Sequence, residues 1–416
     1  MKSLSVLHIN TWGGIGGAFI ASDRLHQGLV DLGIDSTLAY GKIFNNSDSS
    51  LKASKTYKKL EQPNKFERVL SKGCKKIGLN DIGNISSLLL AKKDYFNRAS
   101  ILNFHNLHSD YFSYLALPNL TEDKAAVWTL HDMWSFTGHC AYSYDCSRWQ
   151  TGCGKCPYPN SQPAVERDAT HLEWKIKSWI YSRFKLTIVA PSVWLTEQAR
   201  QSMLNRFPIY HIPYGIDTNV YQPLEKEQCR TLLGLPVGKK VLMFGAQSLT
   251  DRRKGSDLLL KALSCLPKSL KAEIVLLTIG DDSTVSIETL GINTFNLGYI
   301  GSDRLKAIAY SSADLFVFPT RADNLPLVLQ ESMACGTPMV SFNAGGVSDL
   351  VRPGITGYLA EPENAQDFST GIVKLLEDQN LRNHMSQQCR AIALAEYSLQ
   401  LQAQQYINLY HQLLIN

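Results

Sequence analysis

The segment "HIPYGIDTNVYQP", residues 211–223, interrupts an otherwise regular alternation of apolar runs and helical patterns. Its Pro213, Gly215 and Pro223 disfavour a continuous helix or strand. On both sides of it, short apolar runs are followed by amphipathic helical patterns, which is typical of α/β domains with parallel sheets. The segment therefore predicts a linker between two doubly wound units.

The apolar runs on each side are expected to form the strands of one sheet per unit. In the first half they are "LSVLHIN", "TLAYG", "ILNFHN", "AVWTLHD" and "LTIVAPS". In the second half they are "KKVLMFGA", "AEIVLLTIG", "FNLGYI", "DLFVFPT", "TPMVSFNAGG" and "GYLAEP". Because ligands of open parallel sheets bind at the carboxyl ends of the strands, we expect a cleft between the units with one substrate on each side.

Composition agrees with a two-domain globular protein. The chain has 416 residues, 44% of them hydrophobic and 19% charged, and this length exceeds what one core usually supports. No apolar run approaches the roughly 20 residues of a membrane span. Since "MKSLSVLHIN" enters a strand without a signal-peptide pattern, we expect a cytoplasmic protein.

Residues 51–76 are strongly basic, with nine Lys or Arg against two Glu. Such a stretch can lie on an anionic membrane surface or hold a phosphorylated substrate. It can also be a solvated helical hairpin. Few aromatic residues interleave the charges, which argues against nucleic acid as a partner.

Polar residues follow several of the expected strands. In the first half, a glycine loop with Gly16 and Gly17 precedes a helical pattern, so its backbone N–H groups either meet an anion or make a tight turn. His131 and Asp132 follow one strand, and His105 and His108 follow another. A histidine there can contact a sugar hydroxyl, act as acid or base, or cap the next helix.

The second half carries charges that need partners. Arg253 and Lys254 precede a helix start, where cations are unfavourable unless an anion neutralises them; a diphosphate would do so, and a solvated loop is the alternative. Asp323 and Glu331 flank or lie in a helix that is apolar almost all round. Buried carboxylates need donors, and the hydroxyls of a hexose at Asp323 and of a ribose at Glu331 would satisfy them.

Taken together, these residues resemble the retaining GT-B glycosyltransferases of family 4. Asp323, Glu331 and the following "SMACGTPMV" are similar to the family's pair of acidic residues and its "AMACGTPVV"-like segment. The resemblance implies two Rossmann-like domains facing each other across a cleft. Their expected boundaries are 1–210 for the acceptor side, 211–223 for the linker, 224–395 for the donor side, and 396–416 for a final helix that crosses back.

The resemblance also implies roles for individual residues. Catalytic roles fall to His131, Asp323, Arg253 and Lys254. The donor would be bound by Gly16, Gly17, Arg253, Lys254, Asn324, Leu325, Pro326 and Glu331. Their place after strands, rather than the resemblance, makes His105, His108 and Asp132 the expected acceptor residues, with a structural role as the alternative. The family needs no catalytic metal, and its leaving phosphate can take the acceptor proton during transfer with retention.

Three departures from the family pattern bear on the donor. The first acidic residue is Asp323 rather than Glu, an expected Arg after the strand at Phe244 is replaced by Ala246-Gln247, and Asn324-Leu325-Pro326 stands where Gly-Phe-Gly is usual. We therefore expect a UDP-hexose donor, UDP-glucose ahead of GDP-mannose, with the sugar itself left open. The expected acceptor is a soluble or lipid-linked saccharide of a surface polysaccharide, reached by an enzyme peripheral to the inner face of the plasma membrane.

Four cysteines cluster in an insertion at about residues 138–160. They are Cys140, Cys146, Cys153 and Cys156. A two-residue gap lets the last two thiolates reach one tetrahedral ion, so a structural zinc is expected, with two disulfides or free thiols as alternatives. Two other functions also remain open: a nucleotide-sugar epimerase of the same fold, and a sugar-binding or scaffold module without turnover.

Overall fold

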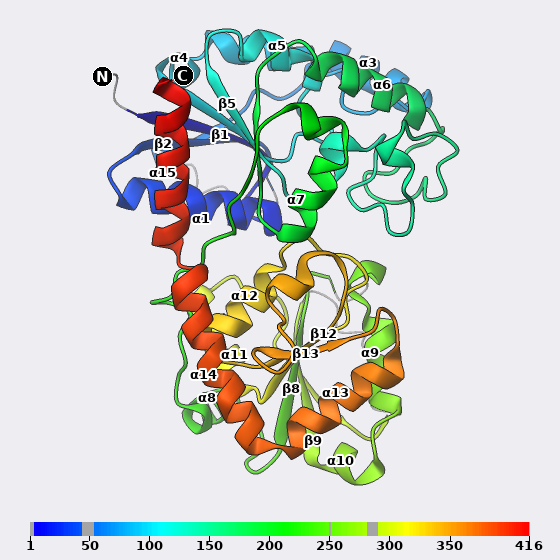
Figure 1. Ribbon diagram of the computed structural model, residues 1–416, viewed down its shortest axis with the longest axis vertical. Coiled ribbons are helices and arrows are strands. Elements are labelled where there is room, and N and C mark those ends of the chain that lie inside the picture. The colour runs from blue at the N-terminus through cyan, green and yellow to red at the C-terminus, as the bar shows by residue number, and fades with distance from the viewer. Residues whose placement is uncertain (1–3, 44–53, 249–250, 281–289, 416) are drawn as a thin grey trace. The chain divides into compact units, whose positions relative to one another are not determined.

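The structure is a computed structural model that describes residues 4–43, 54–248, 251–280 and 290–415. It divides into two compact units, Met1–Gly215 with Gln400–Asn416, and Ile216–Leu399. In each unit helices flank one sheet (Figure 1), and every strand pairing is parallel. The predicted class of two doubly wound, Rossmann-like units is confirmed.

The first unit has a seven-stranded sheet in the order β3-β2-β1-β4-β5-β6-β7. Its strands are β1 Ser5–Gly13, β2 Asp35–Ile43, β3 Tyr57–Lys59, β4 Ile101–Phe104, β5 Ala125–Thr129, β6 Thr187–Ala190 and β7 Ile209–His211. Its helices are α1 Gly17–Asp31, α3 Lys65–Lys76, α4 Asp94–Arg98, α5 Leu117–Leu120, α6 Thr170–Tyr181, α7 Val193–Arg200 and α15 Leu399–Ile415. The two short edge strands, β3 and β7, were not among the expected ones.

The second unit has a six-stranded sheet in the order β10-β9-β8-β11-β12-β13. Its strands are β8 Lys240–Gly245, β9 Ile274–Ile279, β10 Asn293–Asn296, β11 Leu315–Phe318, β12 Met339–Phe342 and β13 Gly357–Ala360. Its helices are α8 Lys226–Leu232, α9 Ser256–Ser264, α10 Lys268–Glu273, α11 Asp303–Ser312, α12 Leu327–Ala334, α13 Ala365–Glu377 and α14 Gln379–Glu396. In both sheets the strand order reverses between the first and fourth strands, and such a switch point is where open α/β sheets bind ligands.

Short 3₁₀ helices complete both units. They are η2 Ile85–Lys92, η3 Tyr114–Ala116, η4 Trp134–Phe136, η5 Arg148–Gln150, η6 Met203–Arg206, η7 Arg252–Lys254 and η9 Gly345–Asp349. Two of them, η4 and η7, follow strands β5 and β8 and carry or adjoin residues singled out above.

Helix α15 belongs to the core of the first unit. Its Tyr406 and Tyr410 are fully buried in a cluster with Leu25 and Leu29 of α1, and Figure 1 shows the red helix beside this part of the unit. The Tyr410 hydroxyl accepts from the Asn103 side-chain amide at 2.8 Å, and the Tyr406 hydroxyl lies 2.9 Å from Thr129 Oγ1. Because both tyrosine hydroxyls are bonded inside the core, the helix is fixed by polar as well as apolar contacts.

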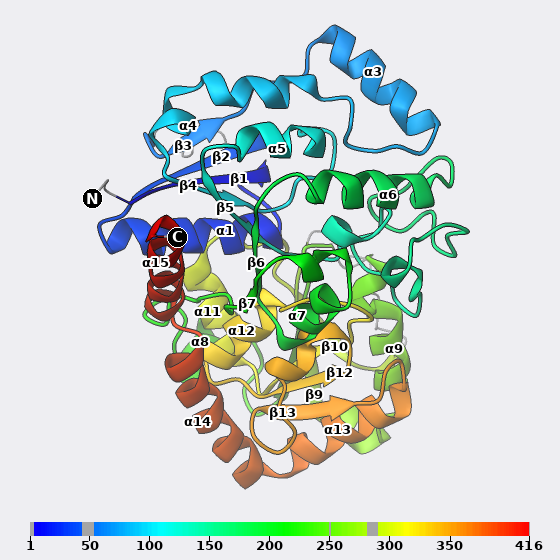
Figure 2. The same cartoon turned by 45° about the horizontal axis from the view of Figure 1, so that its top comes forward.

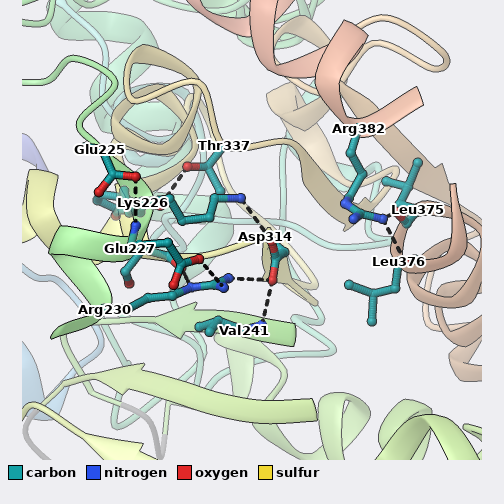
Figure 3. A network of polar contacts seen from close by, with 12 residues as sticks. Glu225, Lys226, Glu227, Arg230, Val241, Asp314, Thr337, Leu375, Leu376 and Arg382 are labelled. Carbon is teal, nitrogen blue, oxygen red and sulfur yellow. Dashed lines mark hydrogen bonds and ion pairs between the residues drawn. The ribbon is translucent and has the colours of Figure 1, made fainter. Parts of the chain in front are cut away.

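A buried ion-pair network anchors α8 to the sheet of the second unit (Figure 3). Asp314 precedes β11, and its carboxylate accepts from Lys226 at 2.9 Å, from Arg230 at 2.7 Å and from the Val241 amide at 2.8 Å. Burial raises the pKa of Asp314, but Lys226 and Arg230 outweigh it, so the net pKa lies below its usual value. Asp314 is therefore a fully paired structural carboxylate.

Within the described ranges, no helix is both long and apolar enough to cross a membrane.

Candidate functional site

The basic pair of the second unit lies at the switch point of its sheet. The chain leaves β8, and Asp251 then caps η7 by accepting from the Arg253 amide at 2.9 Å. Gly255 ends this turn with φ of 74°, and a Cβ there would lie 1.9 Å from the Pro319 carbonyl oxygen. The loop after β8 thus packs directly on the loop after the neighbouring strand β11, and only glycine permits this approach.

Asp323, in the loop after β11, joins the two basic side chains. Its Oδ2 accepts from Arg253 Nη1 at 3.0 Å and from Lys254 Nζ at 2.5 Å. Burial raises the pKa of the Asp323 carboxyl, but Lys254 and Arg253 lower it more, and the net shift is downward. Asp251 Oδ2 also lies 3.4 Å from Arg253 Nη2, so two cations face two carboxylates here, and an anionic ligand would replace a carboxylate as their partner.

The group that contacts Arg253 and Lys254 is not the one that the sequence suggested. That interpretation assigned a diphosphate to the basic pair and sugar hydroxyls to Asp323, whereas the structure places these three side chains in contact. The sequence concealed this pairing because about 70 residues separate the partners, and only the adjacency of β8 and β11 joins them.

The backbone of Asp323 is held by a glycine turn that sequence analysis did not assign to the site. The Gly346 amide donates to the Asp323 carbonyl at 3.1 Å. Gly345 has φ of 60°, and a Cβ there would lie 2.0 Å from that same carbonyl oxygen. The pair of glycines following β12 was the available signal, because such a pair marks a close backbone approach.

Glu331 lies on α12 and is 3% exposed. Its Oε2 accepts from the Tyr310 hydroxyl of α11 at 3.1 Å. Tyr310 is a partner that the sequence did not suggest, since nothing in the spacing of an α11 residue predicts contact with α12. The Tyr310 hydroxyl thus supplies one donor to this buried carboxylate.

The loop between Asp323 and α12 is buried. Asn324 and Leu325 are 2% and 3% exposed, and Pro326 occupies the N-cap position of α12 with φ of −63°. Helix α12 begins at Leu327, directly after Pro326, whose fixed φ suits the start of a helix.

In the first unit, two of the expected acceptor residues, His108 and Asp132, form a bonded pair beyond the carboxyl ends of β4 and β5. His108 Nε2 lies 3.2 Å from Asp132 Oδ2, and Asp132 Oδ1 accepts from the Trp134 amide at the start of η4. Burial raises the pKa of Asp132, but the bond to His108 and its charge lower it more. Asp132 therefore caps a helical turn and orients His108 at the same time.

His131 is bonded through both ring nitrogens. Its Nε2 lies 2.9 Å from His105 Nδ1, and its Nδ1 lies 2.6 Å from the Tyr214 hydroxyl. Burial lowers the pKa of His131 to about 4, so the ring is neutral at neutral pH. Tyr214 and His8, which bonds to the far side of His105, were not identified from the sequence.

The glycine loop of the first unit starts α1. Gly16 is the N-cap with φ of 91° and has no side chain to cap the helix. A Cβ at Gly16 or Gly17 would meet no atom within 4 Å, so the amides of the first turn are not covered from that side. The loop follows β1 and lies at the switch point with β4.

The clustered cysteines do not form the expected zinc site. No group of three or more His, Cys, Asp or Glu within the described part of the chain is placed to hold a metal ion. Cys153 Sγ accepts from the Gly138 amide, and Cys156 Sγ lies 3.2 Å from His139 Nε2. Cys140, Cys146, Cys153 and Cys156 are free thiols, and burial raises the pKa of Cys140 to about 12.

The sequence of this chain is similar to those of several glycosyltransferases. Residues 228–391 match the family model described as "Glycosyl transferases group 1". The putative colanic acid biosynthesis glycosyl transferase WcaC of Escherichia coli is 25% identical over 99% of this chain and 100% of its own length. The D-inositol 3-phosphate glycosyltransferase of Thermobispora bispora is 28% identical over 41% of this chain and 44% of its own.

Solved structures share the fold over the whole chain. Sucrose-phosphate synthase from Thermosynechococcus elongatus superposes with a TM-score of 0.70 at 19% identity, covering 99% of both chains. Anabaena HepE in complex with UDP also has a TM-score of 0.70, at 17% identity, covering 98% of this chain and all of its own. These likenesses confirm the expected GT-B fold.

Proposed function

Because residues 228–391 belong to the Glycosyl transferases group 1 family, we propose that this glycosyltransferase moves a hexose from a UDP-hexose to a growing saccharide with retention of configuration. One observation carries the proposal: Arg253, Lys254 and Asp323 meet at the switch point between β8 and β11. Arg and Lys side chains gathered at a switch point, where open α/β sheets bind ligands, can hold the diphosphate of a nucleotide sugar in place of the carboxylates.

The donor diphosphate binds Arg253 and Lys254 in this proposal. Both side chains reach the Asp323 carboxylate, and Lys254 lies over the Phe318 ring with Nζ 5.0 Å from its centroid. Positive charge held in place beforehand stabilises the negative charge that builds on the leaving UDP. Asp323, released in part from the cations by the phosphates, accepts from hydroxyls of the hexose.

The nucleoside and sugar occupy the rest of the loop and α12. Glu331 accepts from the ribose hydroxyls, as the resemblance to retaining family 4 implies, beside the bond from Tyr310. Asn324, Leu325 and Pro326 line the hexose through their backbone. On the first unit, Gly16 and Gly17 contact the donor through the amides of the first turn of α1. No catalytic metal takes part.

UDP-glucose is the donor we place first. The support is the structure of Anabaena HepE, whose fold this chain shares, in complexes with UDP and with UDP-glucose. The roles given to Asp323 and Glu331 follow the resemblance to retaining family 4.

Transfer with retention requires the new bond on the face that the leaving group departs from. The bond between the hexose C1 and the UDP oxygen breaks, and a bond between C1 and the acceptor hydroxyl oxygen forms on the same face. The acceptor proton passes to an oxygen of the leaving phosphate. Arg253 and Lys254 hold that phosphate, and His131 faces the hexose on the side of the first unit.

The acceptor is a lipid-linked saccharide of a surface polysaccharide, by analogy with the relative named for colanic acid biosynthesis. His105, His108 and Asp132, at the carboxyl ends of β4 and β5, are the residues we assign to it. The side chains of His108 and Asp132 are 15% and 12% exposed, so part of this pair reaches the surface where an acceptor hydroxyl can bond.

Helix α3 brings the enzyme to an anionic bilayer in this proposal, working at the inner face of the plasma membrane. Figure 2 shows α3 standing apart from the sheet of the first unit. Phe66 and Val69 on it are 68% and 70% exposed, and its Lys65, Arg68 and Lys72 are exposed as well. Apolar side chains at helical spacing beside basic ones are typical of interfacial helices. Residues 51–53 of the basic stretch lie outside the described residues.

Membrane binding is tested by sedimentation with vesicles of phosphatidylglycerol and phosphatidylcholine against vesicles of phosphatidylcholine alone. Phe66→Ser with Val69→Ser should abolish binding to the anionic vesicles. A matched double variant, Leu232→Ser with Val237→Ser, changes residues of the second unit that are 73% and 84% exposed and should bind like the native chain. Equal binding by all three proteins would refute the role of α3.

Donor binding is tested by thermal shift with UDP, GDP and ADP, followed by the UDP conjugates of glucose, galactose and N-acetylglucosamine and by GDP-mannose. A ligand that binds only the folded state raises the melting temperature in proportion to the logarithm of its concentration over Kd. UDP and one UDP-hexose should raise it in the native chain and not in Glu331→Ala. A control, Glu361→Ala, changes an exposed glutamate of the same unit and should keep the response. A larger response to GDP would overturn the choice of base.

A further inference from the structure

Three histidines of the first unit stack across its sheet at the switch point. His8 lies in β1, His105 follows β4 and His131 follows β5, and these strands are neighbours in the sheet. The ring centroids of His8 and His105 are 5.2 Å apart, and those of His105 and His131 are 5.1 Å apart. This is close to the roughly 4.8 Å between adjacent strands, so the sheet itself sets the spacing of the rings.

The rings form a continuous row of hydrogen bonds. His8 Nδ1 lies 3.0 Å from His105 Nε2, and His105 Nδ1 lies 2.9 Å from His131 Nε2. His131 Nδ1 in turn lies 2.6 Å from the Tyr214 hydroxyl. At the opposite end, His8 Nε2 has no hydrogen-bond partner among the described residues. We call these three histidines and Tyr214 the imidazole row.

Burial keeps the row neutral. His8 and His105 are 0% and 1% exposed, and His131 is 8% exposed. Burial lowers the pKa of all three rings, as do the neighbouring rings of His26 at His8 and of His131 at His105. A neutral imidazole carries one N–H and one bare nitrogen. Each ring can therefore donate in one direction only, and the three bonds of the row must share one direction.

The shortest bond sets that direction. A separation of 2.6 Å is below the usual range for an N–H donor and within the range for an O–H donor. Tyr214 therefore donates to His131 Nδ1. It follows that His131 donates from Nε2 to His105, and His105 donates from Nε2 to His8.

We propose that His8 and His105 are positioning residues that hold His131 as the Nε2–H tautomer, with its Nδ1 accepting from Tyr214. This inference rests on the role proposed for His131 beside the hexose. It gives a positioning role to His8 and Tyr214 and adds one to His105, which was assigned to the acceptor above. His105 accepts the hydrogen bond that His131 donates from Nε2. This increases the electron density at His131 Nδ1 and strengthens the hydrogen bond that Tyr214 donates to it. The hydroxyl and the ring are then fixed in one orientation.

The direct test is ¹⁵N NMR of the full-length chain labelled at histidine, because protonated and bare ring nitrogens resonate far apart. The inference predicts that His8, His105 and His131 each carry the proton on Nε2 at pH 7.5. It further predicts that His105→Phe, which keeps the ring volume without bonding nitrogens, leaves His131 as a mixture of tautomers. An Nδ1–H signal for His131 in the native chain, or an unchanged single tautomer in His105→Phe, would overturn it.

Kinetics supply the second test, with His26 as a matched control. His26 is a buried histidine beside His8, but its ring bonds to Ser36 and Thr56 and lies outside the row. His105→Phe should lower kcat at least about tenfold with little change in the donor KM, and His26→Phe should leave kcat near the native value. Equal kcat in the two variants would overturn the inference.

His8→Phe removes only the terminal hydrogen bond of the row. It serves as a second variant in case His105→Phe, at the centre of the row, does not fold. It should keep the native melting temperature within a few degrees and still shift the His131 tautomer toward a mixture; an unchanged tautomer in this variant also counts against the row. If the native chain transferred no sugar from any nucleotide donor, the proposed function would fail, while the NMR experiment would still decide on the row.

Discussion

The two units differ in the buried ionisable side chains near the switch points of their sheets. In the second unit, Asp314 and Asp323 remain ionised because each is paired with one lysine and one arginine. In the first unit, the buried histidines are neutral because burial lowers their pKa and no carboxylate bonds to His8 or His105. The same switch point of one fold can therefore carry either fixed charges or oriented neutral imidazole rings.

The largest expected effect comes from breaking the structural pair. Asp314→Ala leaves Arg230, which is 6% exposed, without its buried carboxylate, and it should lower the free energy of unfolding by about 3–5 kcal/mol. Urea denaturation measures this change. Glu273→Gln breaks a surface pair with Lys240 and should have almost no effect; a similar loss in both variants would show that Asp314 is not special.

Lowering the pH should destabilise the first unit, because its buried histidines are neutral. The pKa of His26 is lowered by burial to about 4 from 6.5, so between these values the unfolded state binds a proton that the folded state does not. Stability is therefore lost as pH falls from 6.5 to 4, by about 3 kcal/mol for this residue. His26→Gln cannot titrate, so the native chain should lose about that much relative to it in urea denaturation at pH 7.5 and 4. Parallel pH dependences would contradict the neutral state of His26.

Asp323→Asn should separate function from stability. The amide keeps the shape but removes the charge that Arg253 and Lys254 share and the acceptor proposed for the hexose. We expect kcat/KM for the UDP-hexose to fall about 100-fold, with a smaller loss of stability than for Asp314→Ala. Full activity in this variant would remove Asp323 from the site.

The smallest effect is expected at the carboxylate of α12. Tyr310→Phe deletes the hydroxyl that Glu331 accepts from and should cost about 1 kcal/mol of unfolding free energy. UDP affinity should change little, because the ribose hydroxyls are proposed to bond to Glu331 beside Tyr310. A loss of UDP affinity as large as in Glu331→Ala would mean that Tyr310 orients Glu331 for the nucleotide.

The fold followed from the sequence because its strands are continuous apolar runs, as in "DLFVFPT", that a sheet buried on both faces requires. The edge strands β3 and β7 escaped prediction because three residues at a sheet edge carry no such run. The helix start after Arg253 and Lys254 illustrates a partial success: α9 begins there, but the close approach of Gly255 to Pro319 depends on the order of the strands.

The site was predicted as residue types and only in part as contacts. The sequence indicated Asp323, Arg253 and Lys254 individually. It did not indicate that they pair, because the order of the strands in the sheet cannot be read from it. His8 sits inside an apolar strand, where one histidine gives no signal until β4 and β5 bring two more beside it. The zinc site failed for a related reason: cysteine spacing permits a tetrahedral site but does not fix the turns that bring thiols together.

The most direct test of the account compares the two lysines that bind buried aspartates in the second unit. Isothermal titration with UDP-glucose would be measured for the native chain, Lys254→Ala and Lys226→Ala; Lys226 pairs with Asp314 rather than with Asp323. We expect a strongly weakened affinity for UDP-glucose in Lys254→Ala. Folded Lys226→Ala should bind UDP-glucose like the native chain. Native affinity in Lys254→Ala, or no binding of UDP-glucose by the native chain, would contradict it.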